Sequence, residues 1–215
     1  MAAVIPALVL AAGRSSRMGR VKATLPIDGG DSFLSRIVRT LLDAGVDDVV
    51  IVVGHEADAI VSAFVSSGLP ARFVVNTDYD RGQLSSLVAG LNVIDRPGVS
   101  AALVTLVDVP LVTASTVRAV LECYRQTRAP VVRPTSGTRH GHPLLIDRSL
   151  FAALRTADPQ TGAKPIIRAH ASAAGDLAID DEGAFMDVDT EEEYRAIIDR
   201  SSGVEDDRGP SHGQA

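Results

Sequence analysis

Short apolar runs alternate with longer amphipathic stretches along the first 133 residues. The apolar runs are rich in Val, Ile and Leu and do not alternate with polar residues, which is typical of strands buried on both faces. They predict strands at residues 7–11, 48–53, 71–75, 101–107 and 130–133. Between them, apolar positions recur at helical spacing and predict helices at residues 34–43, 57–65, 85–94 and 115–126.

The elements become shorter after residue 133. The pattern predicts strands at 144–146 and 177–179 and helices at 149–156, 163–170 and 190–200. This strand–helix alternation predicts an α/β fold with three α/β/α layers and a mostly parallel sheet. We expect a single domain over residues 1–200, and a disordered tail over residues 201–215, which lack an apolar pattern.

Composition narrows the classes of partner. The 215-residue chain has a net charge of −6 and no basic stripe, so we expect no nucleic-acid partner. Its one cysteine, Cys123, excludes an intrachain disulfide and favours a reducing compartment. No apolar run is long enough to cross a bilayer, and no basic leader precedes the first apolar segment. We therefore expect a cytoplasmic protein without a membrane partner.

The first strand leads into a loop with candidate anion-binding chemistry. Gly13 and Gly19 allow backbone N–H groups to approach an anion, and Arg14, Arg17 and Lys22 add positive charge. The alternative is a strand-to-helix turn with solvated arginines.

Two acidic sites follow strands or extended segments. Asp108 ends a buried apolar strand, where a carboxylate needs a counter-charge, so it is a candidate Mg²⁺ ligand. Asp187 and Asp189 alternate on an extended segment, and either is a candidate second ligand. The alternatives are a turn or cap role for Asp108 and a helix-cap role for Asp189.

Two further segments carry polar groups. Asn76 ends a strand, and Ser85 and Ser86 lie where a helix starts, so they are candidates to bind a base or ribose, or else plain helix caps. His142 lies between Gly141 and Pro143 and is expected to shape a substrate loop rather than to act as a base.

Together these residues resemble the motifs of the MobA-like NTP transferases, and within that group most closely the molybdenum cofactor cytidylyltransferases. The first motif is Leu10-Ala11-Ala12-Gly13-x-Ser15-x-Arg17-Met18-Gly19-x-x-Lys22. The later motifs follow in the family's order and are Gly82-x-x-Ser85-Ser86-Leu87, Val107-Asp108-x-Pro110-Leu111, Gly141-His142-Pro143 and Val188-Asp189-Thr190-x-Glu192. The resemblance implies a Rossmann-like nucleotidyltransferase fold of the glycosyltransferase-A type.

The resemblance also implies a Mg²⁺-dependent enzyme that moves a nucleoside monophosphate, CMP from CTP, to a phosphate-bearing acceptor such as molybdopterin and releases pyrophosphate. The implied catalytic residues are Arg17, Lys22 and Asp108, and the metal ligands Asp108, Asp189 and, as the alternative, Asp187. The implied nucleotide-binding residues are Leu10, Ala11, Ala12, Gly13, Arg14, Ser15, Arg17, Met18, Gly19, Lys22, Gly54, Asn76, Ser85 and Ser86. The implied acceptor-binding residues are Arg133, Arg139, Gly141, His142 and Pro143.

Base and acceptor remain open at this point. The pair Ala11-Ala12 resembles cytidylyl-transferring members, since an extra methyl narrows the base pocket. Gly82-Gln83-Leu84 departs from the Gly-Met-Ser of molybdopterin-specific members, which keeps a sugar-1-phosphate or another small phosphate as an alternative acceptor. A third hypothesis is a non-catalytic chaperone that delivers the cofactor to a client molybdoenzyme.

Overall fold

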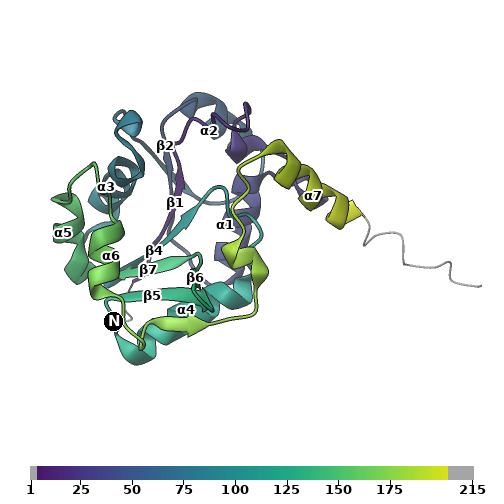
Figure 1. The fold of residues 1–215 in the computed structure, drawn as a ribbon. Coiled ribbons are helices and arrows are strands. Elements are labelled where there is room, and N and C mark those ends of the chain that lie inside the picture. Colours follow the sequence, from purple (N-terminus) through teal and green to yellow (C-terminus); the bar gives the residue numbers. More distant parts are fainter. Residues whose placement is uncertain (1–3, 203–215) are drawn as a thin grey trace, which may run out of the picture.

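The computed structural model describes residues 4–202. In it, a mixed sheet lies between two layers of helices (Figure 1). The strand order is β3-β2-β1-β4-β7-β5-β6, and β8 pairs with β5. Strands β1 to β4 are mutually parallel, whereas β7 runs antiparallel to both β4 and β5. The strands are β1 Ala7–Ala11, β2 Val49–Val53, β3 Arg72–Val75, β4 Ala101–Leu106, β5 Val131–Ser136, β6 Arg139–His140, β7 Leu144–Asp147 and β8 Asp176–Ala178.

The helices cover both faces of the sheet. One face packs against α1 Phe33–Asp43, α2 Ala57–Val65 and α4 Ala114–Thr127. The other packs against α3 Gln83–Ile94, α5 Phe151–Arg155 and α6 Lys164–His170. The last helix, α7 Glu191–Ser202, packs with a smaller apolar cluster beside α1 (Figure 1). The three-layer α/β prediction is confirmed.

Strand β1 is the centre of the core because its side chains serve both layers. Ala7, Val9 and Ala11 point to one face and join the cluster with α1 and α4. Leu8 and Leu10 point to the other face and join the cluster with α3. Gly90 of α3 lies so close to the sheet that an added Cβ would be 2.9 Å from Cδ1 of Leu8. Helix α3 therefore packs directly against β1.

Besides small shifts of other element ends, three departures from the predicted elements affect the site or the tail. The fifth strand runs on to Ser136 and pairs with β6 across a turn at Gly137, whose φ is +59°. Helix α3 begins at Gln83, two residues earlier than predicted, because Gly82 rather than a serine is its N-cap. The last helix extends through Ser202, two residues beyond its predicted end.

The rest of the predicted tail, residues 203–215, lies outside the described residues. The domain boundary at residue 200 stays a prediction. Within residues 4–202, no helix is long and apolar enough to cross a membrane.

Candidate active site

A cleft of about 300 Å³ opens at the carboxyl ends of β1 and β4. Its walls come from the loop after β1, the turn after β4, the start of α3 and the residue before the α7 cap. Parallel strands bring their carboxyl ends to one edge of the sheet, which is where α/β folds bind ligands. The cleft therefore joins the predicted anion loop with two of the predicted acidic residues, Asp108 and Asp189.

The loop after β1 is a tight, anchored turn. Ser15 has a φ of +49° and Gly19 a φ of +66°, and the carbonyl of Ser15 accepts the N–H groups of Met18 and Gly19. The side chain of Met18 is buried in the cluster that contains Val188, on the segment before α7. Met18 thus connects the loop to the acidic segment from the interior, rather than facing the cleft.

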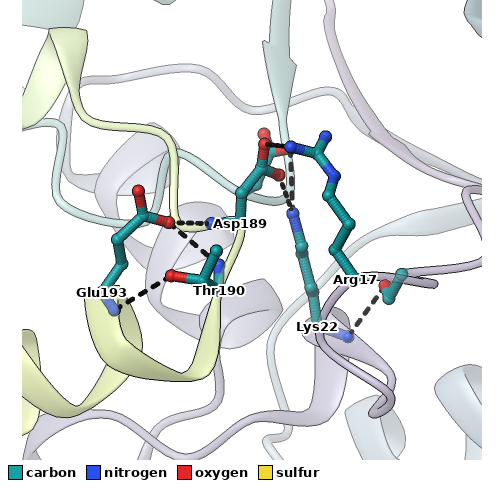
Figure 2. Close-up of polar contacts among 7 residues, drawn as sticks. Arg17, Lys22, Asp189, Thr190 and Glu193 are labelled. Carbon is teal, nitrogen blue, oxygen red and sulfur yellow. Dashed lines mark hydrogen bonds and ion pairs between the residues drawn. The ribbon is translucent and has the colours of Figure 1, made fainter.

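Lys22 brings a buried positive charge to the cleft. Its side chain is only 8% exposed, and its Nζ lies 2.5 Å from Oδ1 of Asp189 and 3.4 Å from Oδ2 of Asp108 (Figure 2). Arg17, which is largely exposed, places Nη1 2.7 Å from Oδ2 of Asp189. Two cations and two carboxylates from three distant parts of the chain therefore meet in one cluster.

Asp108 follows β4 and is held by its backbone as well as by its side chain. Its carbonyl accepts the N–H of Val188 at 2.8 Å, which ties the acidic segment to the end of β4. Its Oδ1 is buried and has no hydrogen-bond partner among the described residues. The side chain caps no described helix, so the cap alternative for Asp108 is wrong.

Asp189 is not a helix cap either. Thr190 takes that role, because its Oγ1 accepts the N–H of Glu193. Oε2 of Glu193 in return accepts the N–H groups of Asp189 and Thr190 (Figure 2). Hydrogen bonding from Lys22 lowers the pKa of the Asp189 carboxyl below its usual value. Asp189 is thereby held ionised and directed into the cleft.

Asp187 lies near this cluster but forms no ion pair with a described cation. Desolvation and then repulsion from Asp108 raise the pKa of Asp187 above its usual value. Asp187 does not line the cleft, whereas Asp189 does. Of the two candidate second ligands, the geometry favours Asp189.

The cleft fits a hard divalent cation. The unpartnered Oδ1 of Asp108 and the ionised carboxylate of Asp189 are oxygen donors of the kind that Mg²⁺ and Mn²⁺ take. No three His, Cys, Asp or Glu side chains are arranged to hold a metal between residues 4 and 202. The donor set therefore fits a cation that shares its coordination with substrate phosphates and water, as Mg²⁺ commonly does.

The Asn76 region positions the start of α3. Nδ2 of Asn76 donates to Oγ of Ser85 and Ser86 at 2.8 and 3.0 Å. Ser86 lines the cleft, whereas Ser85 donates to backbone carbonyls and lines a neighbouring cavity. Neither serine is the helix N-cap, so the cap alternative is wrong for both.

The residues of the cleft that were not predicted include an aromatic and an amide side chain. Tyr79 and Gln83 both line it, Tyr79 on the short helical turn before α3 and Gln83 at its first position. An aromatic ring in the polar loop after β3 was the available signal for Tyr79. Gly54 lies behind that ring, where an added Cβ would be 2.6 Å from Cβ of Tyr79.

The third basic residue of the loop points elsewhere. Arg14 forms a two-pronged hydrogen bond with Asp80, and its guanidinium lies 5.6 Å from the ring centre of Tyr79. Arg14 therefore braces the Tyr79 turn, and only Arg17 and Lys22 of the three predicted cations line the cleft.

The predicted acceptor residues are only partly brought together. Arg133 pairs with Asp176, and Arg139 forms two hydrogen bonds with Glu182, so both guanidinium groups are already neutralised. Neither arginine lines the cleft or the cavity beside it.

The Gly141–Pro143 turn, unlike the two arginines, contributes a residue to the cavity beside the cleft. Gly141 packs against the carbonyl of Ala184, and the His142–Pro143 peptide bond is cis. His142 is half-buried and lines a second cavity, and desolvation lowers the pKa of its imidazole, which favours the neutral form.

The family profile of the MobA-like NTP transferase domain matches residues 7–174. Among curated proteins, the nicotine blue oxidoreductase of Paenarthrobacter nicotinovorans is 33% identical over 90% of this chain and 96% of its own length. A probable molybdenum cofactor guanylyltransferase of Mycobacterium avium is 30% identical over 88% of this chain and 93% of its own length.

Solved structures match the fold over most of the chain. Rv0371c of Mycobacterium tuberculosis matches with a TM-score of 0.76 and 28% identity over 93% of this chain and 99% of its own. Its manganese complex matches with a TM-score of 0.74 and 25% identity over 93% and 100%. The matched profile contains β1, the loop after it and Asp108, and it ends before Asp189. The chain belongs to the MobA-like NTP transferase family.

Proposed function

We propose that the protein transfers a nucleoside monophosphate from an NTP, CTP in preference to GTP, to a phosphate-bearing acceptor, with molybdopterin as the leading candidate. The observation that carries the proposal is the charge cluster at the carboxyl ends of β1 and β4, formed by Lys22, Arg17, Asp108 and Asp189. Family membership and the molybdenum cofactor guanylyltransferase relative support it.

The residues of the cleft divide into those that align the NTP and those that balance its charge. Lys22 is buried and held by two carboxylates, so it presents a fixed charge to the triphosphate. Arg17 is exposed and adds a second, adaptable charge. A divalent metal, Mg²⁺ in our proposal, would be held by Asp108 and Asp189 and would stabilise charge on the reacting phosphate and the leaving pyrophosphate. The acceptor phosphate attacks the α-phosphorus itself, so alignment and charge balance suffice without an enzyme nucleophile.

The preference for CTP over GTP is proposed from the side chain of Ala12. Ala12 is 3% exposed and lines the cleft, so its methyl takes space that a larger purine would need. One methyl changes selectivity by about 1–3 kcal/mol. The guanylyltransferase name of the M. avium relative favours GTP and makes it the second candidate.

Pyrophosphate release with each of the four NTPs, Mg²⁺ and molybdopterin tests the proposal. We expect CTP to give the fastest release, and Ala12→Gly to shift the preference towards GTP by about tenfold or more. Fastest release with GTP from the wild-type protein would overturn the cytidylyl assignment and leave nucleotidyl transfer intact.

A control experiment tests for oxidoreductase activity, which the name of the P. nicotinovorans relative raises. NADH or NADPH with an electron-accepting dye is offered in place of the NTP. We expect no oxidation of the dinucleotide above the protein-free rate. Dinucleotide oxidation without pyrophosphate release from any NTP would contradict the proposed function. Acceptor binding without any turnover would favour the chaperone hypothesis.

A further inference from the structure

Formal charge is distributed unevenly along the cleft. Asp108 and the cations paired with the two carboxylates lie towards β4, on one side of β1. On the other side, towards β2 and β3, the lining side chains carry no formal charge, and they are Tyr79, Gln83 and Ser86. Because phosphates need counter-charges, a nucleotide with its phosphates at the charged end would place its nucleoside at the uncharged end.

The ring of Tyr79 is held in place from outside the cleft. The guanidinium of Arg14 lies 5.6 Å from its centre, and the ring of His55 lies 5.9 Å from it. Gly54 packs so closely that an added Cβ would be 2.8 Å from Cγ of Tyr79. None of these three neighbours lines the cleft, whereas the half-buried Tyr79 does. The ring is therefore braced from outside and presents its remaining surface to the ligand.

Arg14 and Asp80 form the adjustable part of this brace. Nε and Nη2 of Arg14 each donate to a different carboxylate oxygen of Asp80 at 2.9 Å. Such a two-pronged contact fixes orientation as well as distance, and Asp80 is the chain neighbour of Tyr79. The two side chains are 57% and 59% exposed, so their pairing adds little to the stability of the fold. Its effect is local and falls on the position of the ring.

The braced ring lies beside the residue on which the choice of base is proposed. The N–H of His55 donates to the carbonyl of Ala12 at 3.1 Å, so His55 contacts both Ala12 and the Tyr79 ring. An aromatic ring is a suitable surface for a nucleoside, because every base offers a flat face for stacking. The uncharged end of the cleft thus combines a pocket floor with an aromatic wall.

We infer that Tyr79 is the wall against which the nucleoside of the bound NTP packs, and that Arg14 is a positioning residue that acts through Asp80 to set this wall. The inference rests on the proposed nucleotidyl transfer, which places an NTP in the cleft. It gives Arg14 a role different from the direct triphosphate contact that its place in the loop suggests.

Titration calorimetry with two probes, each with Mg²⁺, separates the nucleoside from the phosphates. The probes are the tighter-binding of CTP and GTP, and inorganic tripolyphosphate, which has no nucleoside. We expect the wild-type protein to bind the nucleotide more tightly than tripolyphosphate. Tyr79→Leu should weaken nucleotide binding by about tenfold and Tyr79→Phe should retain it, because only the first loses the ring. Both variants should bind tripolyphosphate as the wild type does, which also shows that they are folded.

Charge reversal tests the positioning role of Arg14. Arg14→Glu and Asp80→Arg should each weaken nucleotide binding and leave tripolyphosphate binding unchanged. The double variant should recover nucleotide affinity to within about threefold of wild type, because the ion pair is restored in reverse. Arg81→Gln is the matched control, since Arg81 lies on the same turn but pairs with Asp78, and it should change neither probe. Arg17→Gln should weaken both probes.

Equal affinity of the wild-type protein for the two probes, or wild-type nucleotide binding by Tyr79→Leu, would overturn the inference. An equal loss of both probes in Arg14→Glu, or no recovery in the double variant, would overturn the positioning role, since Arg14 would then act on the phosphates directly. The expected binding pattern without pyrophosphate release from any NTP would overturn only the proposed function. Pyrophosphate release by a Tyr79→Leu variant with wild-type nucleotide affinity would overturn the inference and uphold nucleotidyl transfer.

Discussion

Asp108 presents its two carboxylate oxygens to different surroundings. Oδ2 faces Lys22, while Oδ1 is buried without a partner. An unsatisfied buried polar atom is costly, and a bound cation would satisfy this one. The only other such side-chain atom among residues 4–202 is Oγ1 of Thr105, three residues earlier on β4.

Thr105 offers a test of what such an atom costs. Its side chain is 1% exposed, so Thr105→Val removes an unpaired hydroxyl at nearly constant volume. We expect the free energy of unfolding to rise by about 1 kcal/mol in urea titrations. Thr116→Val is the matched control, because Oγ1 of Thr116 donates to Asp181 at 2.6 Å. That variant should be less stable by about 1–2 kcal/mol, and equal effects of the two substitutions would contradict the account.

The sequence allowed the chemistry of single residues to be predicted where a strand end implied it. Asp108 and Lys22 are such residues, and they do meet in the cleft. The sequence did not reveal that Arg14, Arg133 and Arg139 form ion pairs with carboxylates. Those partners lie 43 or 66 residues away in the chain, although they are close in the fold. Pairing of that kind depends on tertiary packing.

Helix α7 holds the second carboxylate in place. The reciprocal hydrogen bonds between Thr190 and Glu193 fix its first turn, and Tyr194 packs with Phe33 at 5.8 Å between ring centres. Because Glu193 also accepts the N–H of Asp189, the helix cap and the candidate metal ligand share one side chain. The start of α7 is therefore part of the candidate active site.

Glu193→Ala tests this coupling. Loss of the cap should lower the free energy of unfolding by about 1 kcal/mol and weaken binding of Mg²⁺ with CTP, measured by calorimetry. Glu192→Ala, on the exposed neighbouring position, should change neither quantity. If Glu193→Ala loses stability but binds the nucleotide normally, the cap has no role in placing Asp189.

At the level of elements, the strands on both sides of the cleft were predictable because continuous Val, Ile and Leu runs permit little else. The β5–β6 hairpin was not, since its strands are polar and short. The start of α3 was misplaced because glycine, rather than serine, supplies its N-cap. The serines instead bond to Asn76, a contact that only the folded chain creates.

On the scale of the whole molecule, ion pairs connect α3 to α5 and to the segment that follows β7. Asp95, at the end of α3, accepts from Arg155 of α5 at 2.8 Å and from Arg148, after β7, at 2.7 Å. Hydrogen bonding from Arg155 and from Arg148 lowers the pKa of the Asp95 carboxyl. These contacts hold together the layer that forms the second cavity.

The sign of the resulting pH dependence follows from that lowered pKa. The pair stabilises the fold above the unfolded carboxyl pKa of about 3.9 and loses its effect as the pH falls through the lower folded value. Asp95→Asn should therefore cost about 1 kcal/mol at pH 7 and progressively less below pH 4, measured by thermal unfolding. Asp180→Asn, at an exposed carboxylate, should have the wild-type stability at pH 7. A constant difference between Asp95→Asn and wild type down to pH 2 would contradict the assignment.

The central claim is that Asp108 and its partners support metal-dependent nucleotidyl transfer. Its most direct test is a joint measurement of pyrophosphate and of acceptor mass after incubation with Mg²⁺, CTP and molybdopterin. We predict equimolar pyrophosphate and cytidylylated acceptor from the wild-type protein. Asp108→Asn should react about 100-fold more slowly or worse at an unchanged melting temperature. Wild-type turnover by Asp108→Asn, or no pyrophosphate from the wild-type protein with any NTP, would contradict the account.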